Sequence, residues 1–289
     1  MKRWIPLIVG VALTAASIGG ILALGAAGWP GEADDCIAAA ACFCEEFTEG
    51  VIVAQPWNTW SNLAFVVAGL SLLVAAGIDQ GKWEVRDPTE APNPWVTGGF
   101  YPSFFGVIVM LMGPGSMVFH AGLRQWGSIV DNLSMLMLTG FVILFNVGVL
   151  VPALRKKGVF VATYVGVVGG LIAIEFATKG AQAVTLTIFA VTLLGAVGTE
   201  IALWFNKGKL ARVMRNPAAA VFALSTFVMV FVIWILSRDG GPICDPDGFQ
   251  GHAIWHLGTA VASGVWGHYL RSENNLPDHL DLPRPYEDG

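Results

Sequence analysis

The sequence predicts an all-α integral membrane protein: a bundle of seven transmembrane helices, preceded by one extra hydrophobic helix at the N-terminus. Two observations lead to this fold class. Of the 289 residues, 55% are hydrophobic and only 13% are charged, which is not the composition of a soluble globular domain. Apolar runs long enough to cross a bilayer also recur along the chain. The runs cover residues 5–28, 57–78, 101–122, 130–151, 158–176, 181–205, 217–237 and 250–270.

The polar stretches between these runs are too short for a sizeable soluble domain, so the runs also define the domain organisation. We expect an N-terminal transmembrane helix or signal anchor, an extracytoplasmic segment, a seven-helix membrane domain and a cytoplasmic tail. These parts cover residues 1–28, 29–56, 57–270 and 271–289.

The first run has two interpretations. Lys2 and Arg3 precede it and small residues lie near Ala27, as in a cleaved signal peptide. Its length of about 24 residues favours a retained helix, because the apolar core of a signal peptide is shorter.

The distribution of lysine and arginine predicts the orientation. If every run spans the membrane, the basic clusters all fall on one side, and basic loops stay in the cytoplasm. We therefore expect cytoplasmic N- and C-termini, and all four cysteines outside. The clusters are Lys2 and Arg3, Arg155 to Lys157, the basic residues of 207–215, and Arg271. Clusters this short, lying between apolar runs, do not suggest a nucleic-acid partner, and no protein partner is evident.

Five polar residues on three predicted helices fall at one depth, near the outer membrane face. Ser116 and His120 are four residues apart and share a helix face, Asp131 opens the next run, and His252 and His256 share a face at the start of the last run. Ionisable groups at membrane depth are costly and are candidates for function. Three protein ligands with one open position are typical of catalytic zinc, so the sequence predicts a metal site.

Each of these residues also has an ordinary structural interpretation. A histidine pair can serve only in hydrogen bonds between helices, Ser116 can be a packing residue, and Asp131 can be a helix N-cap. Their combination at one depth favours the metal site. We interpret Glu175 and Glu200 as hydrogen-bonded or interfacial carboxylates, and His268 as a solvated side chain.

The order Ser-x-x-x-His, Asp, His-x-x-x-His on seven helices resembles the alkaline ceramidase family. The resemblance covers about residues 42–270 in order, and the whole set is more specific than any one piece. Its other parts are Phe119-His120 with Leu123, Asp131-Asn132-Leu133-Ser134-Met135, Trp57-Asn58-Thr59-Trp60-Ser61-Asn62, Cys44-Glu45-Glu46, and Trp234 with Asp239 and Cys244.

The resemblance implies a zinc site and a reaction. In that family, residues matching His120, His252 and His256 hold zinc with a water as fourth ligand, and residues matching Asp131 and Ser116 contact that water and act in catalysis. The implied activity is hydrolysis of a linear amide, the N-acyl bond of ceramide or a similar lipid, to a sphingoid base and a fatty acid. The implied partner is a membrane lipid that reaches a site towards the extracytoplasmic side.

The resemblance also implies a disulfide between Cys44 and Cys244. Cys36 and Cys42 are then left as a second pair. Because all four cysteines are expected outside the cytoplasm, both disulfides would persist.

A calcium site is the part of the family pattern from which this sequence departs. Glu45 fits one ligand position, but Phe47 stands where an asparagine is expected and Gln55 where a glutamate is expected. Cys42-Phe43 replaces an aspartate-tryptophan pair. Calcium is therefore a doubtful second cofactor.

Two other functions fit the same scaffold. One is a lipid receptor or binding protein in which zinc only braces the helices. The other is a hydrolase for a different lipid ester or amide.

Overall fold

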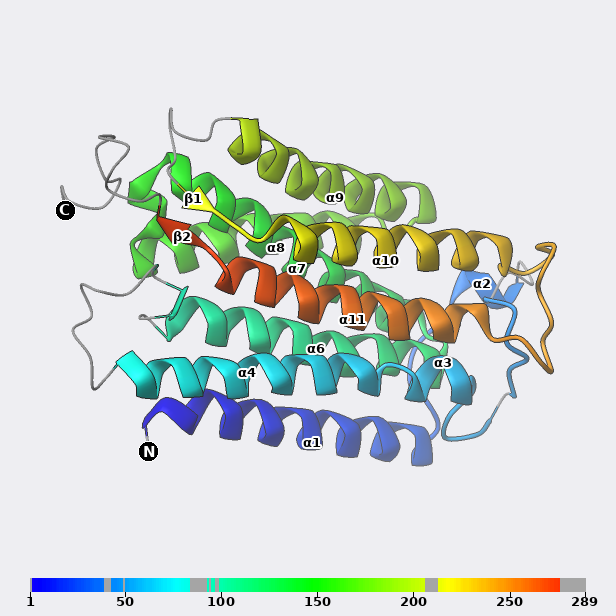
Figure 1. Ribbon diagram of the computed structural model, residues 1–289. Helices are drawn as coiled ribbons and strands as arrows, with labels where there is room; N and C mark the ends of the chain where they lie inside the picture. The colour runs from blue at the N-terminus through cyan, green and yellow to red at the C-terminus, as the bar shows by residue number, and fades with distance from the viewer. Residues whose placement is uncertain are drawn as a thin grey trace.

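The computed structural model describes residues 2–38, 43–48, 50–83, 93, 95–96, 99–205 and 213–275. Long helices run side by side along one axis (Figure 1). They are α1 (Ile5–Ala26), α4 (Leu63–Trp83), α6 (Phe100–Gly122), α7 (Gln125–Leu150), α8 (Lys157–Ala177), α9 (Gln182–Phe205), α10 (Pro217–Leu236) and α11 (Gly251–Arg271). The shorter elements are η1 (Lys2–Trp4), α2 (Asp35–Ala38), α3 (Pro56–Trp60), η3 (Pro152–Arg155), β1 (Val213–Met214) and β2 (Asn274–Asn275), and the two short strands pair antiparallel. The predicted all-α class is confirmed.

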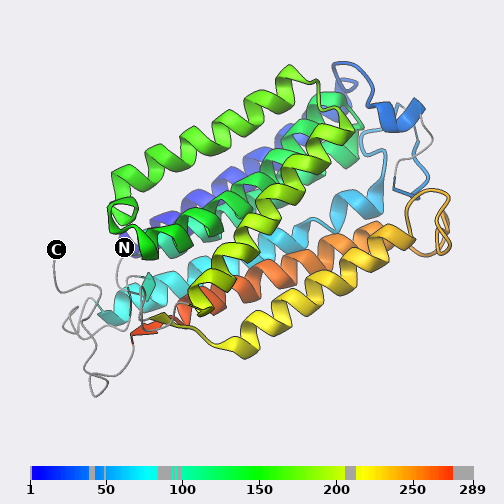
Figure 2. The same cartoon turned by 90° about the horizontal axis from the view of Figure 1, so that it is seen from above.

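Within the described ranges, seven helices are long and apolar enough to cross a membrane, and they correspond to the first seven predicted runs. The eighth run forms α11, which has 21 residues but is not in that set. Its polar side chains His252, His256, Thr259 and Ser263 are buried. Because α11 turns these groups into the bundle, between α4 and α10 (Figure 2), it can span the membrane without showing them to lipid.

α6 is the central helix of the bundle. In the most apolar 18-residue stretch of α6, 78% of the residues are buried, whereas in the corresponding stretches of α9 and α10 only 17% are buried. The outer helices instead expose large apolar side chains, such as Val165, Leu194 and Val221, at 61%, 70% and 62% of their surface. Apolar side chains on the outside and polar ones inside are the pattern of a helix bundle that faces lipid.

Two glycines let α6 approach its neighbours closely. A Cβ atom on Gly69 of α4 would lie 2.5 Å from the backbone nitrogen of Met110, and one on Gly115 of α6 would lie 3.1 Å from Cβ of Ser134 on α7. Small residues allow such contacts between membrane helices. The second contact brings α6 and α7 together beside Ser116.

A buried ionic cluster joins several elements at one end of the bundle. The Arg215 guanidinium lies 2.6 Å from a Glu200 carboxylate oxygen and 2.8 Å from one of Glu273. Tyr269 also donates a hydrogen bond to Glu200, and Arg155 lies 3.6 Å from Glu273. Glu200 is thus ion-paired as well as hydrogen-bonded. The sequence places Arg215 among the basic loop residues, but in the fold this residue is only 6% exposed.

Replacing Arg215 with methionine is expected to destabilise the protein by about 3–5 kcal/mol, because it leaves buried carboxylates without their cation. Thermal unfolding in detergent measures the effect. Lys156→Met is the matched control, since Lys156 is exposed. Equal melting temperatures for the two variants would contradict a structural role for the cluster.

The other predicted carboxylate, Glu175, is 1% exposed and hydrogen-bonded, as expected. The Thr185 hydroxyl donates to Glu175 Oε2 at 2.6 Å. His268, near the far end of α11, is exposed.

Candidate metal centre

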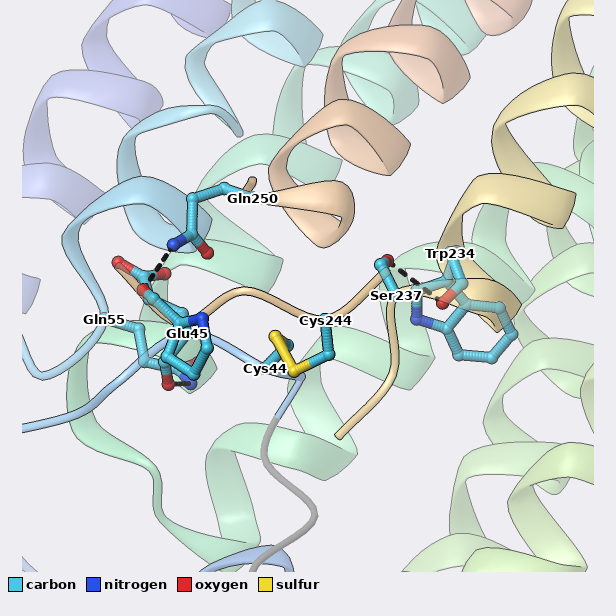
Figure 3. Close-up of a disulfide and its surroundings, with 8 residues drawn as sticks. Cys44, Glu45, Gln55, Trp234, Ser237, Cys244 and Gln250 are labelled. Carbon is cyan, nitrogen blue, oxygen red and sulfur yellow. Dashed lines mark hydrogen bonds between the residues drawn. A yellow bond between two sulfur atoms is a disulfide. The ribbon is translucent and has the colours of Figure 1, made fainter. Parts of the chain in front are cut away.

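The segment before α3 is tied to the loop before α11. Cys44 and Cys244, 200 residues apart in sequence, form a disulfide with a Cα–Cα distance of 5.6 Å (Figure 3). This confirms the first predicted pairing. Cys42 lies outside the described residues, so its pairing with Cys36 stays a prediction.

Removing this disulfide in a Cys44→Ala, Cys244→Ala double variant is expected to lower stability by up to about 5 kcal/mol, because a loop of this length loses much chain entropy when it is closed in the unfolded state. Thermal unfolding of the double variant and of the parent chain, both under non-reducing conditions, measures the loss. A melting temperature equal to the parent's would show that the bridge contributes nothing to stability.

Three buried histidines meet at the end of the bundle that carries this disulfide. His120 lies in the last turn of α6 and is 0% exposed, while His252 and His256 lie in the first two turns of α11 and are 6% and 3% exposed. Their candidate ligand nitrogens all lie within 4.8 Å of one another. The sequence predicted this grouping.

The donor set fits zinc. Nε2 of His252 lies 3.1 Å from Nε2 of His120. Two imidazole nitrogens bound tetrahedrally to one zinc ion, at about 2.0–2.1 Å each, are about 3.4 Å apart. A set of three buried imidazoles, with no carboxylate among them, suits zinc better than calcium, which prefers oxygen ligands.

Ser116 and Asp131 face each other beside this cluster. Ser116 is 4% exposed and precedes His120 by one turn of α6. Its hydroxyl lies beside the Asp131 carboxyl group on α7, although the Ser116 oxygen makes no hydrogen bond of standard geometry. The pair therefore sits one helical turn from a candidate ligand, as the shared depth predicted.

The N-cap interpretation of Asp131 is wrong. The sequence placed the start of this helix at residue 130, but α7 begins at Gln125 and its N-cap is Arg124. Asp131 therefore lies in the second turn, where the backbone N–H groups bond within the helix.

Two polar residues that sequence reasoning did not connect with the histidines contact them. Gln55 Oε1 lies 2.9 Å from Nδ1 of His120, and Ser61 Oγ lies 2.8 Å from Nδ1 of His256. The sequence marks Gln55 only as a departure from the calcium pattern, and Ser61 only as part of the Trp57 to Asn62 segment. The one available signal is the group of polar residues just before an apolar run. In the fold Gln55, Asn58, Thr59 and Asn62 are all 0% exposed.

Glu45, the predicted calcium ligand, caps the N-terminus of α3. One of its carboxylate oxygens accepts from the backbone N–H of Trp57 at 2.7 Å and the other from that of Asn58 at 2.8 Å. Burial raises the pKa of the Glu45 carboxyl group, and the two backbone hydrogen bonds act in the opposite direction. An anionic cap suits a helix N-terminus, and a role of Glu45 in calcium binding stays a prediction.

The chain is similar to known ceramidases over most of its length. The family model described as Ceramidase matches residues 37–282, which is most of the chain. A curated Dictyostelium discoideum protein named "Putative alkaline ceramidase dcd3A" is 23% identical over 249 residues, covering 79% of this chain and 84% of that protein. On the extent of the family match, the chain belongs to the ceramidase family.

Proposed function

We propose that this protein is a zinc-dependent intramembrane amidase that hydrolyses the N-acyl bond of ceramide, or of a similar lipid, to a sphingoid base and a fatty acid. The observation that carries the proposal is the meeting of three buried histidines from two helices, with Ser116 one helical turn from His120 and Asp131 beside Ser116. Family membership supports the reaction class, a hydrolase that acts on an amide.

The metal would be held by His120, His252 and His256. Zinc bound there would polarise the acyl carbonyl group and make a water molecule more acidic.

The remaining chemistry belongs to Asp131 and Ser116. The Asp131 carboxylate takes a proton from the attacking water as the new carbon–oxygen bond forms, and returns it to the nitrogen as the carbon–nitrogen bond breaks. The Ser116 hydroxyl donates a hydrogen bond to the carbonyl oxygen as negative charge develops on it. The contact between the two side chains across α6 and α7 supports a role for both in one site.

A lipid substrate fits the surroundings of the site. The centre is enclosed by helices whose outer faces are apolar. An amide lipid that keeps its chains in the bilayer could bring its polar end to that depth without entering bulk water.

Release of sphingoid base from a fluorescent ceramide by the purified protein tests the proposal. We expect release that stops after treatment with a chelator and returns when zinc is added. Zinc binding without release of either product would favour the receptor alternative. Cleavage of a lipid ester, with ceramide left intact, would favour the other hydrolase.

We further propose that the site faces the extracytoplasmic side and that both termini are cytoplasmic. α3 and the loop before α11 lie at one end of the bundle, while α1 starts and α11 ends at the other (Figure 1). The disulfide joins that loop to the segment before α3. The basic residues Arg155 and Arg271 belong to that second end. This arrangement agrees with the preference of basic residues for the cytoplasm.

A reporter inserted at Gly50, which is exposed, is expected to read as external, and one fused after Gly289 as cytoplasmic. Glycosylation or protease protection of the two fusions measures the sides. Finding both reporters on the same side would contradict this topology.

A further inference from the structure

We propose that Gln55 and Ser61 are positioning residues that hold His120 and His256 in the tautomer with hydrogen on Nδ1, so that both rings present a bare Nε2 atom to the metal. The identity of the metal rests on the proposed function, whereas the tautomers follow from the hydrogen bonds alone. A histidine ligand to zinc commonly has its second ring nitrogen fixed by such a partner.

The orientation of the Gln55 amide group is fixed by its neighbours. Its Nε2 donates to the backbone carbonyl of Glu45 at 3.1 Å, and its Oε1 also accepts from the Asn58 side chain at 3.4 Å. The oxygen therefore faces Nδ1 of His120, at 2.9 Å. An amide oxygen only accepts hydrogen bonds, so Nδ1 of His120 is the donor. Nε2 of the neutral ring is then left with its lone pair.

Ser61 leads to the same result for His256 by a different route. A hydroxyl has one hydrogen to donate, and Ser61 donates it to the backbone carbonyl of Asn58 at 3.2 Å. The His256 ring also hydrogen-bonds to Asn58, whose backbone carbonyl can only accept. The contact of 2.8 Å between Ser61 Oγ and Nδ1 of His256 is therefore donated by the ring. His256, like His120, keeps a bare Nε2 atom.

His252 has no equivalent support among the described residues. Its Nδ1 is buried and makes no hydrogen bond. Its ring instead stacks on Phe43, with 4.2 Å between ring centroids and 27° between planes. The stretch from Phe43 to Ser61 thus aligns two of the three rings by hydrogen bonds and the third by packing.

The segment that carries Gln55 is itself braced against α6. The Gln55 backbone N–H donates to the carbonyl of His120 at 3.1 Å, and that of Ala54 donates to Ala121 at 2.9 Å. Glu45 caps α3 directly after Gln55. A side chain anchored in this way loses little freedom when it orients a ligand, which is what a positioning residue needs.

Zinc affinity, measured by competition with a chromophoric chelator on the purified protein, tests the proposal. Gln55→Met removes the acceptor at similar size and is expected to weaken zinc binding roughly 10- to 100-fold. Gln55→Glu keeps an acceptor and is expected to stay near the parent affinity. Ser61→Ala is expected to weaken binding, and Ser61→Thr to restore it. Thr59→Val is the matched control, because Thr59 is equally buried on α3.

A parent-like zinc affinity in both Gln55→Met and Ser61→Ala would overturn the proposal, as would an equal loss in Thr59→Val. The ¹⁵N spectrum of the metal-free, histidine-labelled protein gives a readout that needs no zinc. We expect the rings of His120 and His256 to carry hydrogen on Nδ1 in the parent chain, and the His120 ring to lose this preference in Gln55→Met. If these results hold but ceramide is not cleaved, the proposed reaction fails while the positioning role stands.

Discussion

Replacing His256 with alanine is expected to remove bound zinc and ceramide hydrolysis together. The side chain is 3% exposed and lies with His120 and His252 in one cluster, and a catalytic zinc site uses three protein ligands. The same double loss is expected for His120→Ala and His252→Ala. Metal analysis and a turnover assay on the purified variants measure both quantities.

His268→Ala is the internal control for this series. His268 lies on the same helix as His252 but near its other end, where it is exposed. Its replacement should leave zinc content and turnover unchanged. If His252→Ala kept full zinc and full activity, the pair on α11 would serve only in packing between helices.

Replacing Asp131 with asparagine is expected to leave zinc in place and to lower turnover by about 10²–10⁴-fold, because it keeps the size of the side chain but removes its proton-transfer role. Ser116→Ala should also retain zinc and lose about 10²–10³-fold, as for the removal of one hydrogen-bond donor to a developing oxyanion. Zinc content and turnover measured on one preparation separate these variants from the histidine series.

Asn132→Ala is the matched control for Asp131. Asn132 is the next residue on α7, but its side chain contacts Thr185 of α9 instead of Ser116. Its replacement should change turnover little. Full activity in Asp131→Asn would remove this residue from the mechanism, and zinc loss in that variant would assign it to metal binding instead.

The bundle and the shared depth of the three histidines could be predicted, because both follow from local patterns along the chain. Apolar runs of spanning length mark the helices, and a spacing of four residues puts His252 and His256 on one face of α11. The start of α7 was placed too late, since Gln125 and Gly127 resemble a turn in sequence. In the fold α7 begins there, and Gly127 lies where a Cβ atom would be 3.1 Å from Cα of Phe119.

The groups around the site could not be predicted, because their roles depend on contacts between distant segments. Ser61 and His256 are 195 residues apart, and Gln55 and His120 are 65 apart. Uncharged polar residues carry no periodic signal of such pairing. For the same reason the sequence places Arg215 in a basic cytoplasmic loop and Glu273 in the cytoplasmic tail, whereas their charges pair inside the fold.

A zinc X-ray absorption spectrum of the purified protein tests the central claim most directly. The account predicts one zinc per chain, with three imidazole nitrogens and one oxygen in its first coordination shell, and loss of that signal in His120→Ala. A purified, folded protein that holds no zinc, a shell without imidazole nitrogens, or a spectrum unchanged in His120→Ala would contradict the assignment of His120, His252 and His256 as the metal centre.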